Sequence, residues 1–178
     1  AMNDLNTQQA SVSVLVDVPV GQAWERLEDF SLAHNYVPKL TRTKIVSTVR
    51  SGLGAHRHVY TGSKYIEETI VQWNEGQGFT IKLHKGAQPM PPFQLAEFDY
   101  LLSEQSLEQT RIELTLRFAM PWGGIGKFLG RSMMLPVMRK QLLQIAAGMK
   151  YFYETGNPAT DADRKRLAGT VETVPAVK

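Results

Sequence analysis

Six short segments separated by turn residues, and one long amphipathic segment after them, constrain the fold more than any other feature of the sequence. The six segments are Thr43–Arg50, Ala55–Thr61, Tyr65–Trp73, Phe79–His84, Gln94–Leu102 and Thr110–Met120. In the last of them, Ile112, Leu114 and Leu116 alternate with charged or polar residues. Regular spacing and short connections predict an antiparallel meander with one covered and one solvated face, rather than βαβ units.

Other periodic segments precede and follow this meander. Ser11–Val18 alternates like a further strand, and Val20–Phe30 and Leu32–Tyr36 predict two short helices, the second closed by Pro38. After the meander, apolar residues recur every three or four positions, at Met134, Met138, Leu142, Ile145, Met149 and Phe152. We expect this amphipathic helix to cover the sheet and to stop at Gly156.

The chain of 178 residues suits a single α+β domain. Residues 11–156 contain all the periodic segments. Residues 1–10 are polar and predict a flexible N-terminus. Residues 157–178 are polar and without periodicity, which predicts a flexible C-terminal tail.

The order of strand, two short helices, six strands and long helix resembles the helix-grip fold of the SRPBCC superfamily, which includes START-like lipid carriers. The resemblance covers residues 11–156 and is closest to the bacterial polyketide cyclase/dehydrase-like group. The residues that carry it are Val18-Pro19, Ala23-Trp24, Leu27, Asp29-Phe30, Val37-Pro38, Gly52-Leu53-Gly54, Glu67 to Val71 and Met149 to Glu154. The resemblance implies a curved antiparallel sheet of about seven strands wrapped around a long C-terminal helix. It also implies a hydrophobic cavity between the sheet and this helix.

The function implied by the resemblance is the binding of a small hydrophobic ligand, such as a lipid, polyketide or isoprenoid, for carriage or sensing. The expected cavity-lining residues are Tyr36, His58, Tyr60, Glu68, Phe98, Tyr100, Phe118, Met134 and Met138. The alternative is a cyclase, aromatase or dehydratase in which His58, Tyr60, Tyr100 or a glutamate moves protons. A second alternative is a protein-interaction module. We expect binding rather than catalysis.

Two neighbouring glutamates, Glu67 and Glu68, add a polar feature. Adjacent residues of a strand face opposite sides, so only one of the two can enter a cavity, and the sequence leaves open which one. A buried carboxylate needs a partner, for which Arg57 on the preceding strand is the candidate. A pair of solvated glutamates is the alternative.

The best candidate for a metal site is the pair His56 and His58, which share one face of a strand. A zinc site needs three or four ligands, and the other histidines, His34 and His84, show no matching spacing. The chain contains no cysteine, which removes thiolate ligands and disulfides. We therefore predict no metal and no other cofactor.

The charge is distributed unevenly. The net charge of +3 is too weak to predict nucleic-acid binding. Residues 123–156 nevertheless carry five basic side chains and one acidic side chain. Lys127 and Arg131 lie among apolar residues there, including Phe128 and Leu129, which predicts either transient contact with a membrane surface or a solvated helix face. With no apolar run of membrane-spanning length and no signal peptide, we expect a cytoplasmic protein.

Overall fold

The computed structural model describes residues 7–175 and confirms the helix-grip architecture. Its sheet has nine strands rather than seven, in the order β2-β3-β4-β5-β7-β8-β1-β9, with β6 paired to β5. The strands are β1 (Thr7–Val16), β2 (Arg42–Ile45), β3 (His56–Thr61), β4 (Lys64–Asn74), β5 (Gly78–Lys85), β6 (Gln88–Pro89), β7 (Leu95–Ser106), β8 (Gln109–Ala119) and β9 (Glu172–Val174). The pairings are antiparallel, as the meander predicts.

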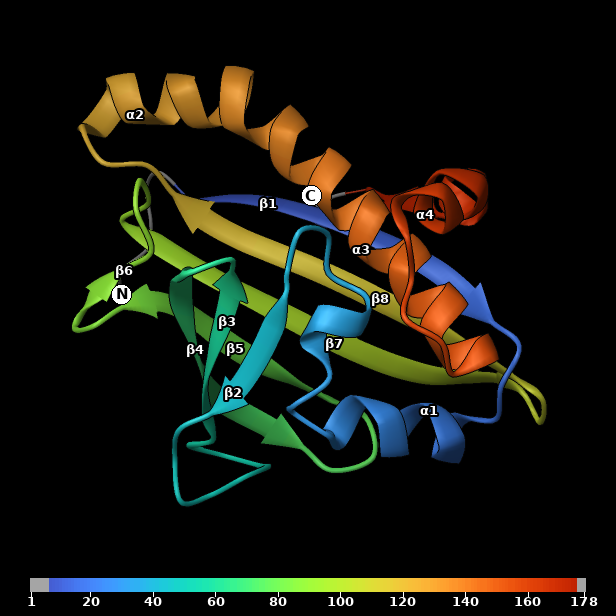
Figure 1. Cartoon of the computed structure of the whole chain (residues 1–178). Helices are drawn as coiled ribbons and strands as arrows, with labels where there is room; N and C mark the ends of the chain where they lie inside the picture. Colours follow the sequence, from blue (N-terminus) through green and yellow to red (C-terminus); the bar gives the residue numbers. More distant parts are fainter. Residues whose placement is uncertain (1–6, 176–178) are drawn as a thin grey trace.

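The helices lie mainly on one side of the sheet (Figure 1). They are α1 (Val20–Glu28), the 3-10 turn η1 (Ala33–Asn35), α2 (Gly123–Leu129), the π-helical turn η2 (Gly130–Met134), α3 (Leu135–Thr155), α4 (Asp161–Leu167) and the 3-10 turn η3 (Ala168–Thr170). α1 and η1 are the two short helices expected after the first strand. α2, η2 and α3 follow one another without a break and form the long helical arm. Within residues 7–175, no helix is long and apolar enough to cross a bilayer.

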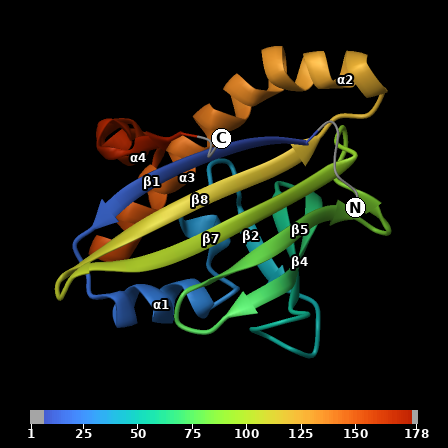
Figure 2. The same cartoon turned by 180° about the vertical axis from the view of Figure 1, so that it is seen from behind.

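The core forms between the inner face of the sheet and α3. Val12 of β1 and Leu114 of β8 pair across the sheet, and both are completely buried. Leu142 and Met149 of α3 are also completely buried, because the helical period turns them to the same side. Seen from behind, β1, β8 and β7 lie in front of α3 (Figure 2). Burial of this apolar face, at about 25 cal/mol per Å², holds the two layers together.

Two glycines set the position and the end of α3. A Cβ atom on Gly148 would lie 2.2 Å from the carbonyl oxygen of Tyr36, so only glycine allows the helix to come this close to the chain after η1. Gly156 has a φ of 77° and caps α3 in the left-handed conformation that favours glycine. Pro136 stands at the start of α3, directly after the π-helical turn η2, where its missing N–H interrupts the hydrogen bonding of the continuous helical arm.

Both ends of the chain differ from the expectation drawn from composition. The sequence predicts a flexible tail over 157–178, whereas the structure has α4 packed on α3 and β9 paired with β1. Thr160 and Asp163 form a capping box that starts α4, and the buried Arg164 donates to the carbonyl oxygen of Tyr36. Polar residues thus cap and anchor this segment, which composition alone does not reveal.

At the other end, residues 7–10 belong to β1 rather than to a flexible N-terminus. Thr7 is paired with Ala119 and Ala10 with Leu116, so β1 runs the whole length of β8. Pairing with a long neighbouring strand stabilises a segment that is too polar to be recognised as a strand by its own pattern. Residues 1–6 and 176–178, also assigned to the flexible ends, lie outside the described residues.

Candidate ligand-binding cavity

A cavity of about 360 Å³ lies between the inner face of the sheet and α3. Most of the residues that line it are apolar. They are Val37, Pro38, Lys39, Leu40, Val59, Thr61, Ile66, Glu68, Ile81, Leu83, Met90, Phe93, Phe98, Tyr100, Leu116, Met138, Gln141, Leu142 and Ile145. Its position agrees with the cavity that the resemblance implies.

Four parts of the structure form the cavity wall. Residues of the inner face come from β3, β4, β5, β7 and β8, while α3 contributes Met138, Leu142 and Ile145, which recur at helical spacing. Residues 37–40, after η1, and the connection between β5 and β7 complete it. That connection contributes Met90 and Phe93, so the proline-rich loop forms part of the cavity wall.

Glu68, one of the polar residues of the wall, forms a buried ion pair with Arg57, which lies opposite it across β3 and β4. The Nε atom of Arg57 lies 2.7 Å from Oε1 of Glu68, and its Nη2 atom lies 2.5 Å from the same oxygen. The Nη1 atom donates to the carbonyl oxygen of Phe30 at 2.9 Å. The guanidinium also stands 3.9 Å from the centre of the Phe30 ring. These contacts compensate the charge of Arg57, whose side chain is almost completely buried.

Tyr36 and Tyr100 surround this ion pair with two buried phenols. Burial raises the pKa of Tyr36, and it raises the pKa of Tyr100 well above its ordinary value. Burial has the largest single effect and would lower the pKa of Arg57, but Glu68, Tyr36 and Tyr100 together outweigh it and raise the pKa. At neutral pH the guanidinium is therefore charged and both phenols hold their protons. Tyr100, which lines the cavity, can donate a hydrogen bond to a ligand oxygen but cannot act as a tyrosinate base.

Four of the expected lining residues line the cavity: Glu68, Phe98, Tyr100 and Met138. Of the two adjacent glutamates, Glu68 faces the cavity, and Arg57 is the partner that the sequence suggests. Three further expected residues are placed in or against the core instead. Tyr36 is buried and stacks on Phe152, Phe118 is fully buried with its ring 5.4 Å from that of Phe93, and Met134 is half-buried against the core.

His58 and Tyr60 are expected in the cavity but lie on the opposite face of the sheet. The inner face of β3 carries Arg57 and Val59, and strand alternation turns His58 and Tyr60 outward. The ring of His58 stacks on that of Tyr65 at 4.1 Å between centroids. The expected orientation fails because a charged arginine normally marks the solvated face, whereas here Glu68 allows it to be buried.

Some lining residues have no local signal in the sequence. Val37, Pro38, Lys39 and Leu40 follow a short helix and show no periodicity. Gln141 is a polar residue on an amphipathic helix, and its place beside Met138 and Leu142 follows only from the packing of α3. The helical spacing of Met138, Leu142 and Ile145 was the one usable signal for this wall.

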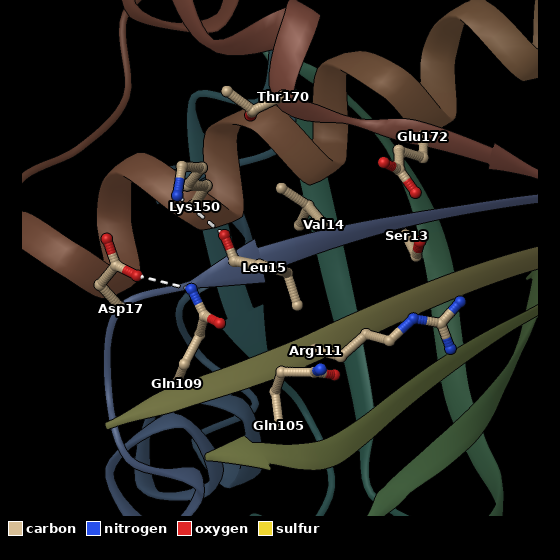
Figure 3. Close-up of a pocket in the computed structure, with 10 residues that line it drawn as sticks. All are labelled: Ser13, Val14, Leu15, Asp17, Gln105, Gln109, Arg111, Lys150, Thr170 and Glu172. Carbon is tan, nitrogen blue, oxygen red and sulfur yellow. Dashed lines mark hydrogen bonds between the residues drawn. The ribbon is translucent and has the colours of Figure 1, made fainter. Parts of the chain in front are cut away.

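A second hollow, of about 430 Å³, lies where β1 and β8 meet α3, η3 and β9, and it is lined mainly by polar groups (Figure 3). Several of these groups already bind one another. Lys150 donates to the carbonyl oxygen of Leu15 at 2.8 Å, and Gln109 donates to Asp17 at 3.0 Å. This hollow offers less apolar surface than the cavity, so it fits a hydrophobic ligand less well.

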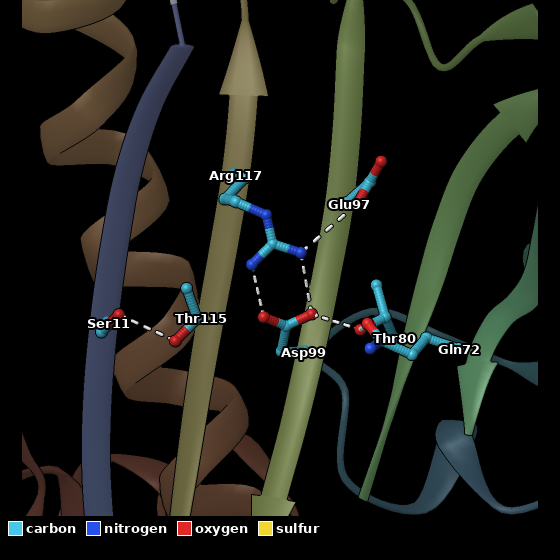
Figure 4. Close-up of polar contacts among 7 residues, drawn as sticks. All are labelled: Ser11, Gln72, Thr80, Glu97, Asp99, Thr115 and Arg117. Atoms are coloured by element: carbon cyan, nitrogen blue, oxygen red, sulfur yellow. Dashed lines mark hydrogen bonds and ion pairs between the residues drawn. The ribbon is translucent and has the colours of Figure 1, made fainter. Parts of the chain in front are cut away.

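A row of polar contacts also crosses the outer face (Figure 4). Arg117 of β8 forms a bidentate pair with Asp99 of β7, and Thr80 of β5 donates to Asp99 at 2.7 Å. Ser11 of β1 and Thr115 of β8 are hydrogen-bonded at 2.8 Å. The outer face is thus polar and internally paired, while the inner face is apolar apart from the Arg57–Glu68 region.

Comparison with solved structures supports this fold. A protein from Nitrosospira multiformis has a TM-score of 0.65 and 13% identity, covering 84% of this chain and 98% of its own. Ara h 8.0201 has a TM-score of 0.62 and 15% identity, covering 83% and 97%. The ZhuI aromatase/cyclase from Streptomyces sp. R1128 has a TM-score of 0.60 and 15% identity, covering 86% and 99%. At such low identities these similarities indicate the fold and not the activity.

Comparison of the sequence, rather than of the fold, assigns the chain to a family. A search among curated proteins finds no significant match. Residues 7–150 match the family described as polyketide cyclase / dehydrase and lipid transport, a range that includes the whole cavity. The chain therefore belongs to the polyketide cyclase/dehydrase and lipid transport family of the SRPBCC superfamily.

Proposed function

We propose that the protein binds a small hydrophobic molecule in the cavity, for carriage or sensing. The observation that carries this proposal is a mostly apolar cavity of about 360 Å³ in whose wall Glu68, held by the buried Arg57, and Tyr100 supply polar groups. Apolar walls supply affinity at about 25 cal/mol per Å² of surface removed from water. The polar region orients the ligand by binding one oxygen atom. A lipid, polyketide or isoprenoid with one carbonyl or hydroxyl group fits this description.

A fluorescence titration with a hydrophobic probe, such as an anilinonaphthalene sulfonate, tests the binding. We expect saturation at about one probe per chain. Met138→Trp places a larger side chain at the cavity wall and should weaken probe binding at least about tenfold. Val137→Trp is the matched control, because Val137 is the neighbouring residue of α3 and is 54% exposed. Equal binding by both variants would place the probe elsewhere and overturn the proposal.

The enzymatic alternative is favoured by one specific observation: charged and phenolic groups meet at the cavity wall. The neutral Tyr100 phenol could protonate a developing enolate, and the Arg57 guanidinium holds Glu68 in place beside it. This supports a cyclisation or dehydration of a polyketide-like chain as a second candidate function. Incubation with a poly-β-ketone thioester analogue, followed by mass spectrometry of the products, tests it. A cyclised or dehydrated product that is lost in Tyr100→Phe would establish catalysis, and unchanged substrate would exclude it for that compound.

Transient contact with an anionic membrane is a further part of the proposal, and it concerns α2 and η2. Ile125 and Phe128 are 71% and 69% exposed, and Lys127 and Arg131 are exposed beside them. Figure 1 shows α2 at the end of the long helical arm, away from the centre of the sheet. Exposed apolar residues between basic ones suit an anionic lipid surface. Leu129, expected to insert with Phe128, is half-buried and contributes less.

Sedimentation with anionic liposomes at low salt tests this contact. Wild-type protein should pellet with the vesicles and be released as salt is raised, because exposed charges are screened within about 8 Å at physiological ionic strength. Lys127→Glu combined with Arg131→Glu should abolish pelleting. Lys64→Glu combined with Lys165→Glu changes the same charge at exposed sites outside α2 and should bind more strongly than the first pair. If wild-type protein stays in the supernatant, the basic residues form only a solvent-exposed helix face and do not bind lipid.

A further inference from the structure

Two histidines and a glutamate converge on the outer face of β3 and β4. His56 and His58 are two residues apart on β3 and share one face, and Glu67 of β4 is paired directly with His58. The Nε2 atoms of His56 and His58 lie 3.0 Å and 3.6 Å from Oε1 of Glu67. All three ligand atoms lie within 4.8 Å of one another. The strand pairing thus supplies the third ligand that spacing along the sequence does not reveal.

The carboxylate of Glu67 is held in place by the turn that follows β5. The N–H of Gly86 donates to Oε2 of Glu67, which leaves Oε1 directed at the two imidazoles. His84 supports this turn, since its Nδ1 atom lies 2.8 Å from the carbonyl oxygen of Gly86. Its Nε2 atom lies 2.8 Å from the hydroxyl of Thr69. Such outer contacts orient the ligands of metal sites in the same way.

The Nε2 atom of His56 is buried and makes no hydrogen bond, although Oε1 of Glu67 lies 3.0 Å away. Buried polar atoms are nearly always satisfied, so an unpaired one that lies within 4.8 Å of two other ligand atoms calls for a missing partner. The side chains of His56, His58 and Glu67 are still 28%, 19% and 14% exposed, which leaves a path for an ion from solvent.

We propose that His56, His58 and Glu67 form a binding site for a divalent transition-metal ion, with Zn²⁺ as the best fit. Two imidazoles and one carboxylate are a known ligand set for zinc with one position left open for water. Ligand atoms around a tetrahedral zinc are about 3.3 Å apart, given bond lengths of about 2.0 Å. The separations of 3.0 and 3.6 Å bracket this value. Imidazole ligands disfavour Mg²⁺ and Ca²⁺, which take oxygen ligands.

This site is separate from the cavity, because it lies on the other side of the same two strands. Arg57 and Glu68 alternate with the ligands along β3 and β4 and point inward. A bound ion would link the two strands on the outer face, directly behind the ion pair of the cavity wall. We therefore expect zinc to stabilise the fold without occupying the ligand-binding space.

Isothermal titration calorimetry with zinc chloride tests the site, using the full chain without an affinity tag after removal of metal by dialysis. We expect one equivalent of Zn²⁺ to bind with a dissociation constant in the micromolar range or below. The melting temperature should rise by at least about 3 °C in excess zinc. Excess Mg²⁺ should neither bind nor displace the zinc.

Variants distinguish the site from adventitious binding. Glu67→Gln keeps the shape of the side chain and should weaken zinc binding at least about tenfold, and His58→Ala should weaken it at least about a hundredfold. His34→Ala is the control, because His34 lies on η1 and is bound to Thr43 instead. Co²⁺ in place of zinc should give the visible absorption of a tetrahedral site in wild-type protein and in His34→Ala, but not in His58→Ala. Less than about 0.2 equivalents of zinc in wild-type protein, or an equal loss in His34→Ala, would overturn the proposal.

Discussion

The two faces of the β3–β4 hairpin carry similar chemical groups in different environments. On the inner face, Arg57 and Glu68 form a buried ion pair that is closed by the carbonyl oxygen of Phe30. On the outer face, His56, His58 and Glu67 form a partly exposed cluster in which one nitrogen has no hydrogen-bond partner. The inner charges are shielded from water, so they must stay paired with each other. The outer side chains are partly exposed and can bind water or an ion instead. Arg57 and Glu68 therefore stabilise the fold, whereas their sequence neighbours His56, His58 and Glu67 remain able to bind water or an ion.

Removal of Glu68 should have the largest effect, because it breaks the inner pair and leaves the arginine charge buried alone. We expect Glu68→Ala to lower the free energy of unfolding by about 3–5 kcal/mol. Urea denaturation followed by circular dichroism measures this change. A loss below about 1 kcal/mol would mean that Arg57 finds water or another partner, and the contrast between the two faces would disappear.

Replacement of both partners tests whether charge balance, rather than another contact, makes Glu68 important for stability. Arg57→Met combined with Glu68→Leu removes both charges and keeps the volume roughly constant. Unlike the single variant, the double variant should unfold with a free energy within about 1–2 kcal/mol of wild type, since apolar replacements of buried pairs are often neutral or stabilising. Its affinity for an oxygen-containing ligand should nevertheless fall. A double variant as unstable as Glu68→Ala would show that the contact with Phe30, and not the charge balance, holds this region.

The buried phenol of Tyr100 predicts a dependence of stability on alkaline pH. Burial raises the pKa of Tyr100 above the ordinary value of 10, so above that pH the folded state binds more protons than the unfolded state. Its contribution to stability is complete below about pH 10 and falls as pH rises, by up to about 1.4 kcal/mol per pH unit.

Urea denaturation between pH 9 and pH 11 isolates this contribution by comparing two variants. Tyr100→Phe removes it and should make the fall in stability shallower, while Tyr36 and Tyr153, whose pKa values burial also raises, maintain the rest. Tyr65→Phe, which removes a phenol that is 38% exposed on the outer face, should leave the fall unchanged. The opposite pattern would place the alkaline sensitivity outside the cavity.

Removal of Glu67 from metal-free protein should have the smallest effect. Glu67→Ala loses one hydrogen bond to the backbone of Gly86, so we expect a decrease of about 1 kcal/mol in the free energy of unfolding. The same denaturation measurement as for Glu68→Ala gives a direct comparison of the two faces. A loss as large as that of Glu68→Ala would show that the outer cluster is already a structural element without an ion.

Much of the fold could be predicted because it rests on local periodicity. The alternation of β8 and the helical spacing of α3 both match the structure, and the Arg57–Glu68 partnership follows from their places on adjacent strands. The inward face of β3 could not be predicted in the same way. Its sequence, HRHVYT, sets Arg57 and Val59 against two histidines and a tyrosine, so neither face is clearly the apolar one. If the wrong face is chosen, every side chain of the strand is assigned to the wrong side of the sheet.

The C-terminal segment is a second case in which the local sequence does not predict the structure. Composition predicts a flexible tail, yet Arg164 is buried against the chain after η1 and Thr173 of β9 pairs with Val12 of β1. These contacts join residues more than a hundred positions apart. No local pattern encodes them, because an isolated three-residue strand is not stable without its neighbour.

The layers of this protein follow from local patterns, since strand alternation and helical period define which residues can share a face. The long amphipathic helix and the absence of thiolate chemistry can be read from the amino acids as well. Three features follow only from the folded chain: which polar residues are buried, which glutamate enters the cavity, and where Glu67 meets the two histidines. The physical reason is that burial and convergence depend on contacts between segments that are distant in the chain, whereas periodicity is a property of one segment alone.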